Sequence, residues 1–164
     1  MQSLMSKDPY FIDEPARISF SGGRTSAYML WRVLQAHDGV LPDHVVVTFA
    51  NTGKELPETL DFVNACAVNW GVPIVWLERY STKEPEGSKK KVRYETKIVD
   101  YFSASRKGEP FNSLIKARGY APNPVARFCT KELKTEAMKY YIRDHHDFPR
   151  PYLTLIGIRA DEER

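Results

Sequence analysis

The feature that most constrains the fold is a short apolar segment, residues 18–20, that ends abruptly at a polar turn containing two glycines. The segment suits a buried strand. Gly22 and Gly23 permit positive φ and leave no Cβ in the way of a ligand. Apolar residues at helical spacing follow the turn: Ala27, Leu30 and Leu34. Thr25 and Ser26 can cap this helix. The sequence therefore predicts a strand, a tight turn and a helix in immediate succession.

The start of this predicted helix is a candidate anion site. A helix N-terminus behind a glycine turn presents free N–H groups and the positive end of the helix dipole, which favour phosphate. The Arg24 guanidinium can add two hydrogen bonds to phosphate oxygens. A turn that binds nothing is the alternative, and the residues favour phosphate. No lysine completes the GxxxxGK[ST] pattern and no third glycine completes GxGxxG, so those two phosphate-binding motifs are excluded.

Further strands and helices alternate along the chain. Residues 44–50 and 73–77 read as strands, with a helix from Pro57 to Gly71 between them. The valine run in the first of these strands indicates burial on both faces. Residues 152–158 read as a fourth core strand. This alternation predicts an α/β fold, a doubly wound and mainly parallel sheet with helices on both faces.

The middle of the chain is less regular. Residues 79–97 are polar, with a basic run at Lys89–Lys91, and are predicted to form a solvated excursion. A flap that meets RNA or DNA is the alternative for this segment. Residues 98–119 are predicted to hold a helix, a break at residues 107–110 and a short second helix. Thr130 is predicted to cap a last helix that runs to about Arg143.

Length and composition indicate an ordinary globular protein. The 164 residues suit one domain with a real core. The net charge of +3 does not indicate a dedicated nucleic-acid binder. No apolar run is long enough to span a membrane and the N-terminus shows no signal-peptide pattern, so we expect a cytoplasmic protein without a membrane partner.

Two cysteines, Cys66 and Cys129, make neither a disulfide framework nor a four-cysteine metal site. Cys66 lies inside the predicted second helix and is expected to pack in the core. Cys129 lies at a helix start beside Arg127 and Lys131, where the thiolate and its reactivity are favoured. A buried structural role fits Cys129 at least as well.

Cations gather around the start of the last predicted helix. Lys131 and Lys134 are three residues apart and share a helix face, and Arg127 lies just before the helix. Together they make a candidate site for a phosphate or sulfate. Taken alone, an ordinary solvated basic face explains these residues better.

Four segments carry a resemblance to a known family. Ser21–Ser26 resembles the PP-loop, the SGGxxS turn of the adenine nucleotide alpha-hydrolase-like superfamily, and the closest match is its phosphoadenosine phosphosulfate (PAPS) reductase-like branch. Three further segments resemble signatures of that branch in the family's order: Asn51–Gly53 with Pro57–Thr59, Arg127–Lys134, and Gly157–Arg164. The chain stops on the last residue of the fourth signature, which predicts a natural protein longer than these 164 residues.

The resemblance implies a Rossmann-like domain whose ligand is ATP or PAPS. The nucleotide-binding residues that it implies are Ser21, Gly22, Gly23, Arg24, Thr25, Ser26, Asn51, Thr52, Gly53, Lys134, Arg159 and Arg164. It implies that Arg127 and Lys131 face the substrate anion, and Cys129 is the candidate nucleophile. The resemblance also makes Mg²⁺ a candidate cofactor. Thr25, however, stands where many superfamily members carry Asp, so a carboxylate that could bind Mg²⁺ is missing there. No iron–sulfur cluster is expected, because Cys129 lacks a second cysteine nearby.

Three functions follow as hypotheses. The first is an enzyme that cleaves or transfers at the phosphate or sulfate end of ATP or a related adenylate. The second is a PAPS reductase-type oxidoreductase, in which Cys129 or the thiol of a partner protein replaces the family's C-terminal cysteine. The third is a non-catalytic module that binds a nucleotide or a nucleic acid.

Overall fold

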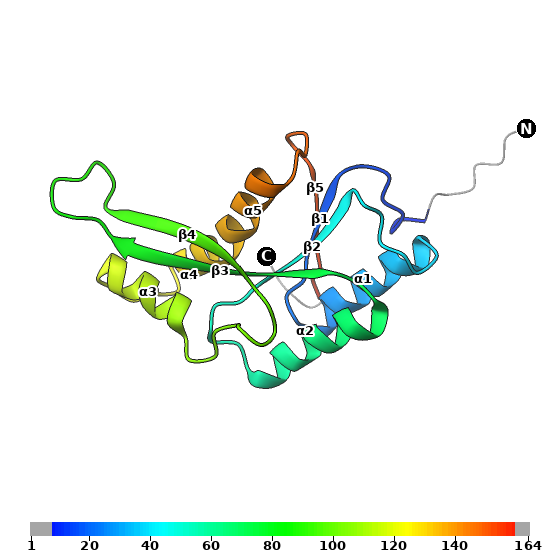
Figure 1. The fold of residues 1–164 in the computed structure, drawn as a ribbon, viewed down its shortest axis with the longest axis horizontal. Helices are drawn as coiled ribbons and strands as arrows, with labels where there is room; N and C mark the ends of the chain where they lie inside the picture. The colour runs from blue at the N-terminus through cyan, green and yellow to red at the C-terminus, as the bar shows by residue number, and fades with distance from the viewer. Residues whose placement is uncertain (1–7, 160–164) are drawn as a thin grey trace, which may run out of the picture.

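A five-stranded sheet forms the centre of the protein, for which a computed structural model describes residues 8–159 (Figure 1). The strands lie in the order β4-β3-β2-β1-β5. β1 (Ala16–Ser19), β2 (Val45–Ala50), β3 (Ile74–Lys83) and β5 (Leu153–Ile156) are parallel, and β4 (Val92–Val99) is antiparallel to β3. The predicted α/β fold with a mainly parallel sheet is confirmed.

Helices cover both faces of this sheet, as predicted. α1 (Arg24–Ala36) and α2 (Pro57–Trp70) lie against one face (Figure 1). The other face is covered by α5 (Ala137–His145), which continues a helical segment made of α4 (Phe128–Thr130) and η1 (Lys131–Glu136). α3 (Glu109–Arg118) lies beside the far end of β3. No helix in residues 8–159 is long and apolar enough to cross a membrane.

The central strand β2 shows why the sheet is buried on both sides. Side chains alternate along a strand, so Val45, Val47 and Phe49 face α1 and α2, while Val46 and Ala50 face α5. All of them are buried. Each large apolar side chain buried in this way stabilises the fold by about 1.5–3 kcal/mol. The valine run is therefore buried on both faces of the sheet, as the sequence predicted.

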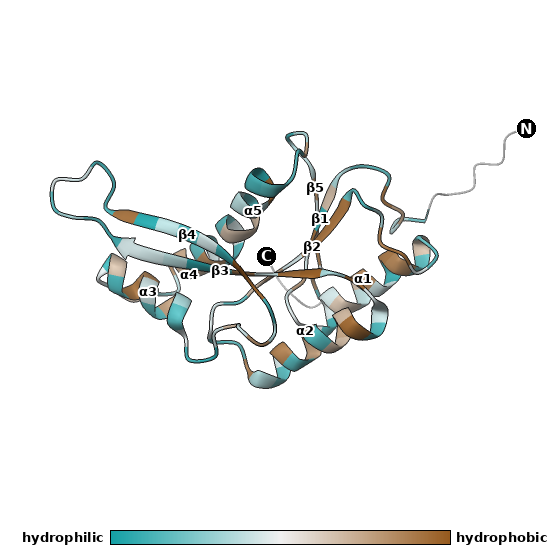
Figure 2. Ribbon diagram, in the orientation of Figure 1, coloured by the Kyte–Doolittle hydropathy of each residue, from teal (hydrophilic) through white to brown (hydrophobic). Residues whose placement is uncertain are grey.

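A long hairpin extends from the sheet. β3 pairs with β2 only through Leu77, but continues to Lys83 with β4 beside it. α3 takes the place of β2 along this extension, and the Ser81 N–H donates to Ser113 Oγ at 3.1 Å. Figure 2 shows brown, apolar residues in β1, β2 and the start of β3, and mostly pale or teal residues along the hairpin. The predicted strand at residues 73–77 was too short, because polar residues such as Glu78 and Arg79 continue it.

The helix expected shortly after Ile98 is absent. Residues 98 and 99 complete β4, and residues 100–107 form turns. Residues 107–110 are not a break between two helices but the start of one, since α3 begins at Glu109 with Pro110 in its first turn. The connector after the hairpin is therefore a loop.

The predicted helix caps are also wrong. The residue preceding α1 is Gly23, so Thr25 and Ser26 lie inside the first turn and no side chain caps the helix. Thr130 lies inside the last helical segment, which begins at Phe128 and ends at His145.

β5 differs from the core strand that residues 152–158 predicted. It is an edge strand, hydrogen-bonded only to β1 within the described sheet. Leu153 and Ile156 are 39% and 61% exposed. This strand is therefore only partly buried, although its residues are mostly apolar.

Candidate functional site

The loop between β1 and α1 leaves the sheet at its carboxyl edge. The Phe20 N–H donates to Thr48 O at 2.8 Å, which ties the loop to β2. The first helical bond of α1 runs from the Ala27 N–H to Gly23 O, at 3.1 Å. The N–H groups of the first turn have no acceptor inside the helix. Because no side chain caps α1 and its first turn holds no acidic residue, these groups suit an anion.

Two serines brace this loop from within. The buried Ser26 hydroxyl donates to Gly23 O at 2.9 Å and accepts the Ser21 N–H at 3.1 Å. The Ser21 and Ser26 hydroxyl oxygens lie 3.0 Å apart. Ser26 therefore shapes the loop through its side chain.

Close packing fixes the loop against its neighbours. Gly22 has φ +78°, and a Cβ there would lie 2.6 Å from Thr59 Cγ2 of α2. A Cβ on Gly157, directly after β5, would lie 2.8 Å from both Cα and N of Ser26. Only glycine at residue 157 lets β5 end directly against the first turn of α1. Sequence reasoning named Gly157 within a motif but did not recognise it as a site residue.

The loop after β2 is held by the buried side chain of Asn51. Its Nδ2 donates to Glu78 Oε1 at 2.7 Å and to Ser105 O at 2.9 Å, and its Oδ1 accepts the Gly53 N–H at 3.0 Å. These bonds use both amide hydrogens and the amide oxygen. The Asn51 side chain therefore supports the loop from behind.

Glu78 is the centre of that support, and sequence reasoning missed it. Its buried carboxylate also accepts the Ser105 N–H at 2.6 Å, the Ser105 hydroxyl at 3.0 Å and the Tyr80 hydroxyl at 2.8 Å. Burial, and then this carboxylate, raise the pKa of Tyr80, although a hydrogen bond with Ser105 opposes them. The sequence did hold a signal for this role. Glu78 directly follows the apolar residues 73–77, as Asn51 follows β2, and so lies at the same edge of the sheet.

A π-helical turn brings a lysine to the same loop. Lys134 of η1 lies with its Nζ 3.2 Å from Glu55 Oε1, which also accepts the Thr52 hydroxyl at 3.1 Å. π-helical turns are rare and often occur at functional sites. Lys131 is exposed, and no ion pair within residues 8–159 includes it. Lys134 therefore lies beside the loop after β2.

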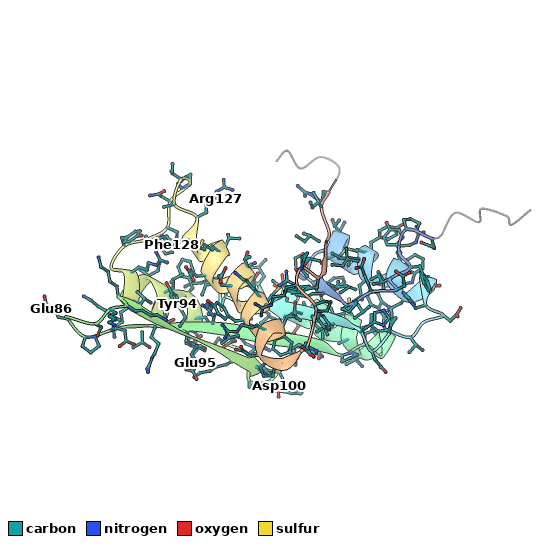
Figure 3. The ribbon with its side chains drawn as sticks, turned by 90° about the horizontal axis from the view of Figure 1, so that it is seen from above. Glu86, Tyr94, Glu95, Asp100, Arg127 and Phe128 are labelled. Atoms are coloured by element: carbon teal, nitrogen blue, oxygen red, sulfur yellow. The ribbon has the colours of Figure 1, made fainter. Side chains whose placement is uncertain are left out.

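The other predicted catalytic residues lie in different surroundings. Arg127 is exposed, and its Nε donates to Pro124 O of its own loop at 3.1 Å (Figure 3). The Cys129 thiol is free and half-buried, and it packs against Leu114, Phe128 and Leu133. Cys66 is buried in the main core, as predicted, and burial raises the pKa of its thiol.

Three arginines were predicted to complete the site. Arg24 is exposed at the first residue of α1. Arg159 is exposed and lies two residues after Gly157, so the end of β5 brings it toward the α1 loop. Arg164 lies outside the described residues.

The described residues do not offer a metal site here. Within residues 8–159 there is no group of three His, Cys, Asp or Glu side chains that could hold a metal ion. Glu55, in the loop after β2, already binds Lys134 and Thr52, and the Glu78 carboxylate accepts four hydrogen bonds. Hard cations prefer oxygen ligands such as carboxylates, and the first turn of α1 holds no acidic residue.

Three cavities among the described residues lie away from this edge. Two of them, of about 960 Å³ and 520 Å³, lie along the β3–β4 hairpin. A third, of about 440 Å³, lies at the opposite edge of the sheet, beside Val45 and His146. None of these three is lined by Ser21–Ser26.

A family model and two known proteins match the chain. Residues 15–164 match the model of the phosphoadenosine phosphosulfate reductase domain. The chain is 36% identical over 148 residues to the uncharacterized nin region protein ORF290 of Escherichia phage lambda, covering 90% of this chain and 49% of that protein. It is 26% identical over 151 residues to an uncharacterized protein of Methanocaldococcus jannaschii, covering 92% of this chain and 24% of that protein. No solved structure matches the chain.

The chain thus spans about half the length of the phage relative and about a quarter of the archaeal one. The family model, in contrast, covers nearly the whole chain and includes all four signature segments. The fold and the glycine-braced α1 loop are consistent with that match. The protein belongs to the phosphoadenosine phosphosulfate reductase domain family.

Proposed function

We propose that the chain binds an adenine nucleotide at the start of α1 and acts on its phosphate or sulfate end. The observation that carries this proposal is the uncapped first turn of α1, which Gly22 and Gly157 hold at the carboxyl edge of the sheet. Ligands of open α/β sheets bind at this edge. Family membership supports a nucleotide or PAPS as the ligand.

The proposed roles follow from position. The N–H groups of Gly22–Ser26 hold the β- and γ-phosphates of ATP, or the phosphosulfate of PAPS. Lys131, Lys134 and Arg159 supply positive charge from η1 and from the end of β5, with Arg24, Arg127 and Arg164 as further donors. Asn51, Thr52 and Gly53 border the nucleotide, with the Asn51 side chain shaping the loop instead of contacting the ligand.

The reaction that suits these donors is displacement at the α-phosphorus of ATP. A nucleophile forms a bond to the α-phosphorus as the bond to the bridging oxygen breaks, and pyrophosphate leaves with the electron pair. Water as nucleophile gives AMP, and another acceptor gives an adenylylated product. Fixed cations and N–H groups stabilise the charge that develops on the leaving pyrophosphate.

Calorimetry with ATP, PAPS and AMP, each with and without Mg²⁺, tests the binding step. Tight binding of ATP or PAPS, with AMP at least 10-fold weaker, would support phosphate or sulfate recognition at the α1 loop. Pyrophosphate release is then followed with water and with candidate acceptors. Binding of ATP without any pyrophosphate release would reject the displacement and leave a nucleotide-binding module.

Sulfur transfer is a second candidate because Cys129 is a free thiol at the start of the α4–η1 segment. In that reaction the thiolate attacks the PAPS sulfur, the adenylate leaves, and a thiol of a partner protein releases sulfite from the resulting adduct as a disulfide forms. Sulfite release from PAPS that is lost in Cys129→Ser would support this role. Unchanged sulfite release in that variant would remove Cys129 from it.

The domain organisation and location also stay predictions. One family model covers residues 15–164, which supports the proposal that residues 1–164 form a single domain. Action in the cytoplasm is proposed from the sequence alone.

A further inference from the structure

A second basic site lies on the hairpin, apart from the α1 loop. It is a cavity of about 520 Å³ between β3, β4 and α5. Cationic and aromatic side chains dominate its lining: Arg79, Lys90, Arg93, Tyr94, Tyr140 and Arg143. None of these residues belongs to the proposed adenylate site.

Arg79 is the most unusual of them, because it is buried without a counter-ion. It is only 5% exposed, and no ion pair within residues 8–159 includes it. Its Nη1 donates to Thr96 Oγ1 at 3.0 Å, whereas its Nε is buried without a partner. An unpaired buried cation lowers stability by several kcal/mol. An anionic ligand in the cavity would supply the missing partner.

Two tyrosines hold Arg79 in place. The guanidinium carbon lies 4.7 Å from the ring centroid of Tyr94 and 4.6 Å from that of Tyr140, and Arg143 lies 4.2 Å from the Tyr140 ring. Cation–π contacts offset part of the cost of burial. The two tyrosine rings therefore hold the arginines in the cavity.

The remaining positive charge is spread along the hairpin. Arg143 is neutralised by Asp144, with its Nη2 3.0 Å from Asp144 Oδ2, and Arg93 lies 3.5 Å from Glu84. Lys90, like Arg79, takes part in no ion pair among residues 8–159. Lys90 belongs to the basic run Lys89–Lys91, which is exposed beside the hairpin tip, marked by Glu86 in Figure 3. Cations spaced along a strand match successive phosphates better than one small anion.

We propose that this cavity and the adjoining lysines bind the phosphodiester backbone of a single-stranded nucleic acid without regard to base sequence. A flexible single strand can place one phosphate inside the cavity against Arg79 and lay the next along Lys89–Lys91. A rigid duplex cannot bend its backbone into the cavity in this way. Grooves of this kind track the backbone electrostatically.

The test uses the whole chain and fluorescence anisotropy of labelled oligothymidylate and oligoadenylate over a series of salt concentrations. Both oligonucleotides should bind with similar affinity, and each phosphate contact should add about −0.7 to the slope of log affinity against log salt. The variant Lys90→Gln should therefore weaken binding about 5-fold near 0.1 M salt and flatten the slope by about 0.7.

Lys97→Gln is the matched control. Lys97 is also an exposed lysine of the hairpin, but it follows Thr96 and so points to the opposite face, 4.8 Å from the Tyr80 ring. It should leave binding unchanged. Arg79→Gln should weaken binding more than Lys90→Gln does, and if that variant fails to fold, the two lysine variants still decide the question.

Several results would overturn the proposal. The proposal is wrong if the single strand does not bind at low salt. It is also wrong if Lys90→Gln and Lys97→Gln weaken binding equally, or if a duplex binds as tightly as the single strand. Displacement by inorganic phosphate at matched ionic strength would show a small-anion site instead. Displacement by ATP would show that the strand occupies the α1 loop, whereas failure of ATP to bind at all would reject only the adenylate proposal.

Discussion

The α1 loop and the hairpin cavity are both suited to anions, but they are built from different groups. The loop offers backbone N–H groups, held by Gly22 and Gly157, with no side-chain cap. The cavity offers arginine side chains, held by tyrosine rings. A backbone site depends on chain geometry that any added Cβ disturbs, whereas a side-chain site depends on charge that single substitutions remove. The two can therefore be broken separately.

Glu78 gives the largest expected effect, because its buried carboxylate supports the loop after β2 from β3, the strand that also carries Arg79 of the cavity. The carboxylate accepts four hydrogen bonds: one from Asn51 in the loop after β2, two from Ser105 in the connector after β4, and one from Tyr80 on β3 itself. Glu78→Ala leaves buried donors unpaired, so we expect the free energy of unfolding to fall by about 3–5 kcal/mol. Urea denaturation measures this change. The exposed Glu95 on β4 is the control, and Glu95→Ala should cost less than about 0.5 kcal/mol. A loss below about 1 kcal/mol for Glu78→Ala would contradict a supporting role for this carboxylate.

Glu78 also shows where sequence reasoning stopped. The glycine turn, the strand before it and the helix behind it are local features, and each could be predicted from adjacent residues. The support from Glu78 and Ser105 joins segments 27 residues apart. The close approach of Gly53 to Gly108, where a Cβ on Gly53 would lie 2.8 Å from Gly108 Cα, joins segments that are still further apart. Such contacts depend on tertiary packing, which spacing alone does not predict.

The sequence did not predict that β3 continues to Lys83 and pairs with β4, for a related reason. A strand that continues as Glu78, Arg79 and Ser81 lacks the apolar alternation that identifies strands. Its polar side chains are buried by partners from α3, α5 and residue 105. The burial of Cys66, in contrast, could be predicted, because this residue lies within the apolar helix α2.

A single methyl group tests the backbone site. Gly157→Ala places a Cβ 2.8 Å from the Ser26 backbone, so we expect a loss of about 1–3 kcal/mol in stability and of adenylate binding. Thermal unfolding and calorimetry measure both. Gly23→Ala adds the same methyl where its closest contact is 3.5 Å, at φ −99°, and should change stability by less than about 1 kcal/mol. Equal stability losses in the two variants would contradict the packing argument.

Substitution of Lys134 tests whether its positive charge contributes to adenylate binding near the start of α1. Lys134→Gln should weaken adenylate binding about 10-fold, if one charge-assisted contact contributes roughly 1.5 kcal/mol. Its stability should change by less than about 1 kcal/mol, because the ion pair with Glu55 is partly exposed. Calorimetry with ATP compares it with Lys116→Gln, which removes an exposed charge from α3. Equal affinities in the two variants would exclude Lys134 from the site.

His146, at the opposite edge of the sheet, gives the smallest effect. Burial, and then the nearby His145, lower the pKa of His146. The unfolded chain therefore binds the proton more readily, and stability from this group is full above about pH 6.5 and is lost as the pH falls below it. His146→Gln should flatten the dependence of stability on pH in that window while leaving both anion sites intact. Urea denaturation at several pH values measures this dependence. If stability changes with pH equally in the variant and in the original protein, His146 is not its source.

The most direct test of the account follows the backbone amides of the α1 loop by nuclear magnetic resonance while ATP or PAPS is added. The N–H signals of Gly22–Ser26 should show the largest shifts in the protein, and those of the hairpin should stay still. If an adenylate binds while the signals of Gly22–Ser26 remain unchanged, the start of α1 is not where the nucleotide is held.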